Sequence, residues 1–188
     1  KQLIRAYVEP EYIQYLQYRF EWSNDTIGII AWKSLSLAIQ RIQRNVLITK
    51  VCNDLLPTAA TLYKQRYQEH DTCVLCQREE TREHLVRCPA DSRLRWRRHM
   101  LQAIRKRLDH LETEFAITET ICTAVAEWLE YGTVDVVKYP QRFHKAIKSQ
   151  TIIGWRHFFG GKISQEWLKL QDESTNITTT KKPEGYIW

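Results

Sequence analysis

Apolar side chains recur along this chain mainly at steps of three and four residues, the spacing of one face of an α-helix. The clearest case is residues 31–53, where basic side chains fall mainly off a continuous apolar stripe. The stripe consists of Trp32, Leu35, Ile39, Ile42, Val46 and Thr49. The pattern therefore predicts one long amphipathic helix over residues 31–53.

The same spacing predicts further helices on both sides of this one. A short helix is expected over residues 9–22, opening with Pro10, a residue that the first turn of a helix accepts. The other expected helices cover residues 58–66, 90–108, 118–131, 140–152 and 163–171. Residues 133–138 form a β-branched run that fits either a strand or an extended connector. The chain has only 6 Gly and 5 Pro, which favours long helices over many short strands.

The domain organisation follows from this pattern. No internal repeat or domain boundary is visible, so we expect a single helical domain over residues 1–172. The polar, Thr-rich residues 173–188 are expected to form a flexible tail. The predicted fold class is mostly α, an irregular helical domain with an inserted loop in segment 71–92.

Composition narrows the class of protein. The chain is 43% hydrophobic and has 7 Trp and 9 Tyr, which supply ample material for a core. No apolar run approaches the ~20 residues that a membrane helix needs, and no signal peptide is visible. The net charge of +6 permits attraction to nucleic acid or other acidic surfaces, although solvated Lys and Arg faces explain it equally well.

Cysteine usage suggests a reducing environment. The five Cys are at positions 52, 73, 76, 88 and 122, and three of them fall within sixteen residues. An odd number clustered in this way is not typical of a disulfide framework. We expect an intracellular reducing compartment rather than a secreted location, with Cys52 and Cys122 packed in the core.

The clustered cysteines predict a metal site. Cys73 and Cys76 form a Cys-x-x-Cys pair, and His84 and Cys88 are four residues apart, so that both project from one side of a helix. Three sulfurs and one nitrogen make the closed tetrahedral set of one structural Zn²⁺, with no open position for a catalytic water. Thiolate ligands argue against Mg²⁺ and Ca²⁺. The alternative interpretation is three ordinary buried cysteines and a surface histidine.

This segment resembles the zinc-binding segment that follows the polymerase region in many non-LTR retrotransposon reverse transcriptases. The resemblance is carried by Cys73-x2-Cys76, Glu83-His84-Leu85-x2-Cys88-Pro89, Ser92-Arg93 and Trp96. Flanking segments are similar as well, chiefly to reverse-transcriptase-like proteins of algal and diatom type: Leu55-Leu56-Pro57-Thr58, Ile153-Gly154-Trp155 and Ile163-Ser164-x2-Trp167. The resemblance implies an accessory C-terminal part of such a protein, or a host protein descended from one, and a location in the nucleus or the cytoplasm. The spacing between the ligand pairs is longer than in a retroviral zinc knuckle.

No catalytic residues are predicted. The chain has no Tyr-x-Asp-Asp pair, no acidic set spaced for two metal ions, no phosphate-binding glycine loop and no His-Glu-x-x-His motif. We therefore expect a protein that is not an enzyme.

Two functional hypotheses remain. The first is a module that binds RNA or DNA through the basic helix after the zinc segment, with Trp96 and His99 stacking on unpaired bases or, for Trp96, packing in the core. The candidate contact residues are Arg93, Arg95, Arg97, Arg98, Arg105 and Lys106. The alternative is that these basic side chains form a solvated surface and pair with acidic neighbours such as Glu112 and Glu114. The second hypothesis is a structural or protein-interaction module in a larger assembly, in which zinc serves only stability.

Overall fold

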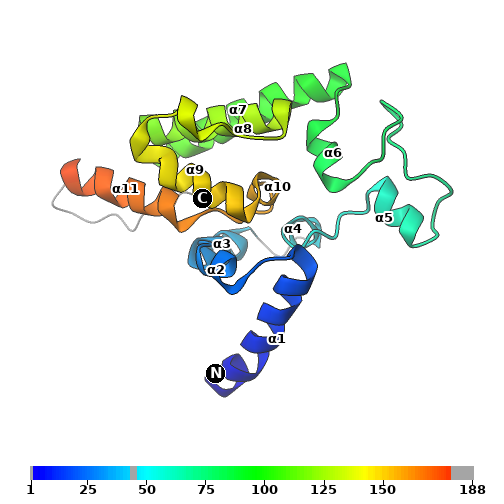
Figure 1. The fold of residues 1–188 in the computed structure, drawn as a ribbon, viewed down its shortest axis with the longest axis horizontal. Coiled ribbons are helices and arrows are strands. Elements are labelled where there is room, and N and C mark those ends of the chain that lie inside the picture. Colours follow the sequence, from blue (N-terminus) through cyan, green and yellow to red (C-terminus); the bar gives the residue numbers. More distant parts are fainter. Residues whose placement is uncertain (1, 43–45, 179–188) are drawn as a thin grey trace.

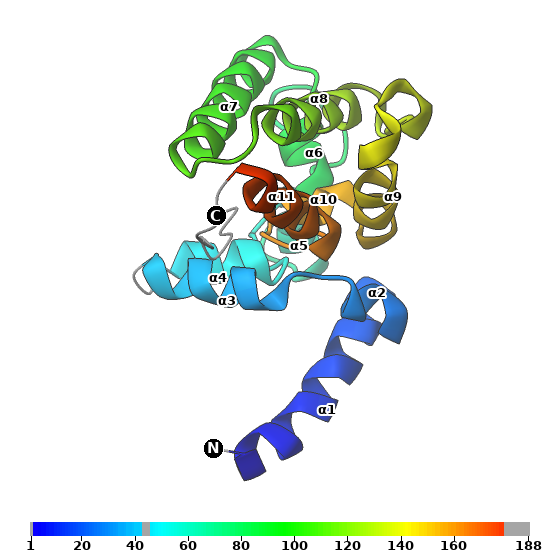
Figure 2. The same cartoon turned by 90° about the vertical axis from the view of Figure 1, so that its left-hand side faces the viewer.

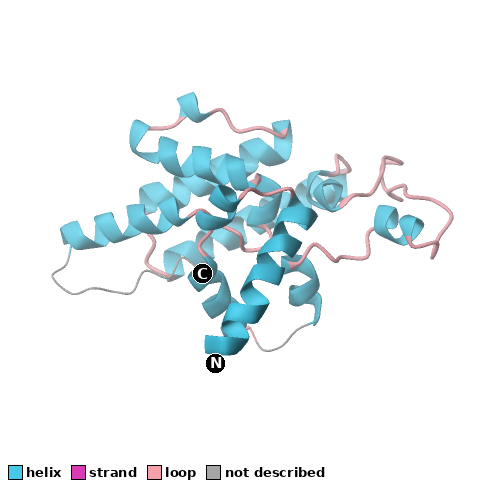
Figure 3. Ribbon diagram, turned by 60° about the horizontal axis from the view of Figure 1, so that its bottom comes forward, coloured by secondary structure: helices cyan, strands magenta, loops and turns pink. Residues whose placement is uncertain are grey.

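The structure, a computed structural model, describes residues 2–42 and 46–178 and is built from helices (Figures 1 and 3). The first helices are α1 (Gln2–Phe20), α2 (Asn24–Gly28), α3 (Trp32–Arg41), α4 (Val46–Cys52), α5 (Ala59–Lys64) and α6 (Arg82–Arg87). They are followed by α7 (Asp91–His110), α8 (Phe115–Tyr131), the 3₁₀ turns η1 (Val136–Lys138) and η2 (Gln141–Phe143), α9 (His144–Ile153), α10 (Trp155–Phe158) and α11 (Gln165–Thr178). Over the described ranges only two isolated β-bridges occur, so the predicted mostly helical class is confirmed.

The core is centred on α8, which is buried along most of its length. Helix α7 lies along one side of α8, and α9 and α11 pack from below (Figure 2). The fully buried side chains of this cluster include Ile117, Ile121, Phe143, Ile147 and Trp167. Each large apolar side chain removed from water stabilises the fold by about 1.5–3 kcal/mol, so this bundle supplies most of the apolar stabilisation of the described residues.

Helix α8 ends where the sequence indicated, at a glycine. Gly132 adopts φ +80 and its N–H donates to the Trp128 carbonyl at 2.8 Å, which terminates the helix. A left-handed backbone of this kind is readily adopted by glycine but is strained for other residues. Gly28, the last residue of α2, has no positive φ, and a Cβ added there would meet no atom within 4 Å.

These two glycines give a matched stability prediction. Gly132→Ala is expected to lower the free energy of unfolding by about 1 kcal/mol because alanine resists the positive φ. Gly28→Ala is expected to leave stability unchanged or raise it slightly, since a helical position accepts alanine. Urea unfolding of both variants measures the difference; equal effects would contradict the assignment of strain to Gly132.

The single long helix predicted over residues 31–53 is wrong. Helix α3 ends at Arg41, where Ile42 turns to an extended conformation with ψ 94, and α4 begins at Val46. Of the predicted stripe, Leu35, Ile39 and Ile42 line a groove beside α3, whereas Val46 is 71% exposed and α4 faces the same groove with Leu47, Ile48 and Val51 instead. Spacing alone does not distinguish one helix from two short helices that face a common surface.

The two ends of the chain also differ from the prediction. Helix α1 begins at Gln2, so Pro10 lies inside the helix instead of opening it. Helix α11 runs to Thr178, so residues 173–178 of the predicted tail are helical, and residues 179–188 lie outside the described residues. Residues 133–138 contain the 3₁₀ turn η1 and no strand.

The end of α1 is joined to the bundle by a second, smaller apolar cluster. Leu16, Phe20 and Trp22 are buried there against Ile153 at the end of α9. The indole N–H of Trp22 also donates to the Ile153 carbonyl at 3.1 Å. The rest of α1 extends away from the bundle (Figures 1 and 2).

Candidate metal centre and the neighbouring basic helix

Cys73 and Cys76 lie in a tight turn between α5 and α6. The backbone N–H of Cys73 donates to the Arg78 carbonyl at 2.7 Å, and that of Gln77 donates to the Cys73 carbonyl at 2.8 Å. Gln77 has φ 61, a left-handed conformation that reverses the chain directly after the second cysteine. The reversal turns both thiols to the same side.

The other two candidate ligands come from α6. The Thr81 hydroxyl caps this helix by accepting the backbone N–H of His84 at 3.2 Å. Cys88 follows the last residue of α6, so that it lies one turn beyond His84 on the same side. A short helix capped by Thr81 therefore brings His84 and Cys88 to the same side.

The structure brings all four predicted ligands together. The ligand atoms of Cys73, Cys76, His84 and Cys88 all lie within 4.8 Å of one another. The sulfurs of Cys73 and Cys88 are 3.9 Å apart, and the Cys76 sulfur is 3.2 Å from His84 Nε2. Ligand distances of about 2.3 Å for sulfur and 2.0 Å for nitrogen give a tetrahedron with edges of about 3.5–3.8 Å. The separations are close to this size and too long for an S–S bond, so the group can hold a metal ion.

The environment of these side chains is compatible with ligation. Burial lowers the pKa of His84, and Arg78, Arg93 and Arg97 lower it further, which favours the neutral imidazole that metals bind. Burial alone would raise the pKa of Cys76, but the backbone N–H of Arg78 and the neighbouring thiols lower it. Burial raises the pKa of the Cys88 thiol.

Cationic side chains attach this metal-binding segment to the helical bundle. The Arg87 guanidinium pairs with Glu83, donates to the Leu129 carbonyl and lies 5.5 Å from the Trp128 ring centroid. From α7, the Arg97 guanidinium donates to the Cys88 carbonyl at 2.5 Å. The segment is thus held against α8 by Arg87 and against α7 by Arg97, independent of a metal.

The six cationic residues predicted on the helix after the metal segment divide into two groups. Arg97 is half-buried and its guanidinium bonds the backbone, and Arg105 pairs with Glu119 on α8 at 2.7 Å. Arg95, Arg98 and Lys106 are exposed, and Arg93 is half-buried. Within residues 2–42 and 46–178, no ion pair engages these last four residues.

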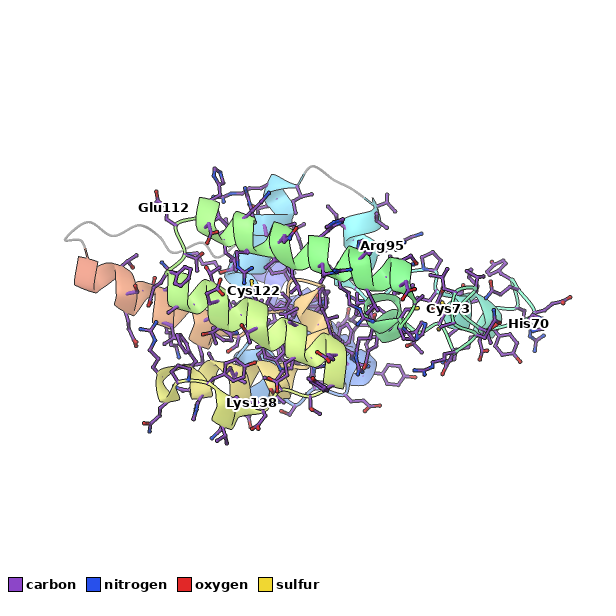
Figure 4. All side chains as sticks on the ribbon, turned by 90° about the horizontal axis from the view of Figure 1, so that it is seen from above. His70, Cys73, Arg95, Glu112, Cys122 and Lys138 are labelled. Atoms are coloured by element: carbon purple, nitrogen blue, oxygen red, sulfur yellow. The ribbon has the colours of Figure 1, made fainter. Side chains whose placement is uncertain are left out.

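Three of these four cations share one side of α7. At 3.6 residues per turn, Arg95, Arg98 and Lys106 fall within about a quarter of the helix circumference, with Gln102 among them. We call Arg95, Arg98 and Lys106 the basic face. Figure 4 shows Arg95 near the end of α7 that lies toward Cys73, so the basic face starts beside the metal centre.

The remaining sequence-predicted residues take varied positions. Trp96 is 40% exposed and His99 is exposed, so neither is packed in the core. Cys122 is buried, as predicted, and Cys52 is partly buried. Glu114, one of the two acidic residues considered as partners for the basic helix, instead pairs with Arg142 on η2.

A polar cluster beneath the metal segment was not predicted. Asp54, with φ 60, accepts from Arg82 of α6, and Lys162 donates to the Cys52 carbonyl at the end of α4. Burial lowers the pKa of Lys162 to about 8. The partners are separated by 28 and 110 residues in sequence, so no local signal indicates them.

Comparisons of the chain with protein-family models, curated proteins and solved structures gave no match. In the described part of the chain, the helices are too short or too polar to cross a membrane.

Proposed function

We propose that this protein is a non-catalytic accessory domain of a reverse-transcriptase-like, retroelement-derived protein, in which one zinc ion fixes the Cys3His segment and α7 binds nucleic acid. The observation that carries the proposal is the basic face, three cations without an ion-pair partner among the described residues, on one side of a helix whose other side is fixed in the core. The spacing of the four candidate ligands, with Pro89 directly after Cys88, resembles that of retroelement proteins and supports the proposed origin.

The donor set supports zinc in particular. Three thiolates and an imidazole are soft to borderline ligands, and a single closed set of four is what structural zinc prefers. Thiols that must stay reduced to bind metal support an intracellular reducing compartment, such as the nucleus or the cytoplasm.

The chemistry of the basic face fits phosphate backbones. Arg95 and Arg98 present planar guanidinium groups that bind phosphate oxygens through two parallel N–H donors. Contacts of this kind do not discriminate between bases, and they release counterions, so binding is expected to weaken steeply with salt. The partly exposed Trp96 and exposed His99 lie on the same helix and are available to stack on unpaired bases.

The test is binding of the zinc-loaded protein to short RNA and DNA in a salt series, measured by fluorescence anisotropy. Combined charge reversal of Arg95, Arg98 and Lys106 to Glu is expected to weaken binding more than tenfold. It should also reduce the slope of log affinity against log salt by about two to three units, since each lost phosphate contact contributes ~0.7–0.9.

The matched control reverses three exposed lysines on other helices, Lys33, Lys50 and Lys148. It makes the same change in net charge but leaves the basic face intact, so binding should stay close to that of the parent protein. Equal losses in both triple variants, or no binding at low salt, would reject the basic face as a nucleic-acid site. The second hypothesis, a zinc-stabilised protein-interaction module, would then be favoured.

A further inference from the structure

A large apolar groove separates the α3–α4 pair from the bundle. Its cavity has a volume of about 500 Å³. One wall carries Leu35 and Ile39 of α3, Ile42 just after it and Ile48 of α4, and the opposite wall carries Met100 and Ile104 of α7. Volumes of several hundred Å³ with mainly apolar walls are typical of small-molecule sites.

The floor of the groove is formed by residues 158–161, between α10 and α11. A Cβ at Gly161 would lie 2.8 Å from Leu35 Cδ1, and one at Gly160 would lie 3.3 Å from the Val51 carbonyl oxygen. The two glycines therefore allow α3 and α4 to approach the bundle closely. This close approach gives the groove a closed floor of packed side chains and backbone.

The mouth of the groove leaves apolar surface in water. Ile39, Ile42 and Leu47 all line it and remain 42%, 46% and 57% exposed. Exposed apolar side chains that converge on one hollow, unlike scattered ones, favour a binding site for an apolar group. The bound group would recover the free energy of removing these side chains from water.

The charged side chains at the groove indicate which polar group a bound apolar molecule would carry. Among its described lining residues are two cations, Arg41 and Arg107, and no carboxylate. Arg107 is exposed and forms no ion pair with any described residue. An apolar chain in the groove with its anionic end at Arg107 would match both the shape and the charge.

We propose that this groove binds a long-chain aliphatic carboxylate, with the hydrocarbon chain between α3–α4 and α7 and the carboxylate at Arg107. A chain on the order of twelve to sixteen carbons is suited to a cavity of this size. Arg107 lies on the side of α7 that carries Met100 and Ile104, away from the basic face, because these residues follow at steps of four and three. The two sites are therefore separable by experiment.

The chain offers a direct probe of the groove, since Met100 is its one methionine. In protein labelled at the methionine methyl group, a single NMR signal reports on the groove wall. Laurate, added below its critical micelle concentration, is expected to shift this signal saturably. Dodecanol should bind more weakly, and dodecylamine weakest, because Arg107 attracts the carboxylate and repels the amine.

Two variants separate the apolar and the charged parts of the site. Ile39→Asp places a carboxylate in the mouth and should weaken laurate binding more than tenfold, while Ile152→Asp, at an isoleucine on α9 that is also exposed, should leave it unchanged. Arg107→Gln should weaken laurate about two- to fivefold, since the pairing is partly exposed to water, and leave dodecanol unchanged.

The proposal is overturned if laurate does not shift the Met100 signal, or if Ile39→Asp and Ile152→Asp bind laurate equally. Dodecylamine binding as tightly as laurate would overturn the assignment of a carboxylate. Reversal of the basic face should leave laurate binding intact, so failure of the nucleic-acid proposal leaves this one standing.

Discussion

Replacing Cys88 with serine is expected to abolish stoichiometric zinc binding and to unfold the segment from the Cys73 turn to the end of α6. This segment has little apolar material of its own, because α6 has no buried residue and the tip residues Val74 and Leu75 are 84% and 48% exposed. The free energy of metal binding would thus be its main source of order. Structural zinc sites in small peptides contribute about 10–16 kcal/mol of apparent binding free energy, which becomes folding free energy.

Loss of the metal is expected to unfold the Cys73–Cys88 segment first and to leave the helical bundle folded. Arg87 still faces the Leu129 carbonyl of α8, and Arg97 of α7 still faces the Cys88 carbonyl, but without metal the segment that carries Arg87 and Cys88 would have no fixed course. Limited proteolysis should therefore cut first between Cys73 and Cys88, while the α8 core stays folded. Metal analysis should give about one zinc per chain for the parent protein and well below that for Cys88→Ser.

Cys122→Ala is the matched control because Cys122 is also buried but lies on α8, outside the ligand cluster. This variant should retain its zinc and its resistance to cleavage in the metal segment, whatever its cost in core packing. A parent protein that contains no stoichiometric zinc, and whose protease resistance is unchanged by a chelator, would refute the metal site.

The convergence of the four candidate ligands was predictable from sequence because the signal is local. Cys73 and Cys76 share one turn, and His84 and Cys88 share one side of a short helix, so spacing alone indicates convergence. Helix class was predictable for the same reason, since a step of three or four residues places side chains on one face. The first and last residues of α7 and α8 therefore agree with the predicted helix boundaries to within three residues.

Contacts between distant segments were not predictable. Arg97 and Arg105 belong to the cationic pattern of α7, yet their partners lie 32 and 14 residues away on α8. Nothing in the local pattern distinguishes them from Arg95 and Arg98, which form no ion pair with any residue that the structure describes. The break after α3 was not predictable because the spacing of three and four residues continues from Ile42 to Val46 and Thr49, although these two side chains are exposed on α4 and do not line the groove.

His157, in α10, is isolated in the sequence, but its surroundings in the fold are expected to make the protein sensitive to acid. His157 is 2% exposed, and its ring lies edge-on to Phe20 at 5.0 Å and to Trp22 at 4.8 Å. Its Nε2 accepts from Arg156 Nε at 3.0 Å, and its Nδ1 is buried without a hydrogen-bond partner among the described residues. The imidazole thus joins the end of α1 to the bundle in its neutral form.

Burial lowers the pKa of His157 to about 3, with Arg156, Lys162 and Arg82 acting in the same direction and Asp54 opposing them. In the unfolded chain the pKa returns to about 6.5. Between these two values the unfolded state holds a proton that the folded state does not, so stability falls as the pH falls. The contribution is fully present above pH ~6.5 and is lost progressively down to pH ~3, a total of about 5 kcal/mol at 1.36 kcal/mol per pH unit.

His157→Gln is expected to remove this part of the acid sensitivity. Between pH 6.5 and 5 the parent protein should lose about 2 kcal/mol more of its free energy of unfolding than the variant, as measured by urea unfolding at each pH. Zinc ligands also take up protons over this range, but they do so equally in both proteins, so the difference isolates His157. His99→Gln, at an exposed histidine of α7, should retain the acid sensitivity of the parent.

The fluorescence of Trp22 separates this mechanism from a general acid effect. Because the His157 ring packs on Trp22 and Phe20, protonation should first loosen the end of α1, with the α8 core following at lower pH. Comparison with Trp22→Phe identifies the part of the fluorescence signal that comes from Trp22, and the change in that part should shift to lower pH in His157→Gln. Parallel stability curves for the parent and His157→Gln would mean that the buried imidazole does not govern the acid response.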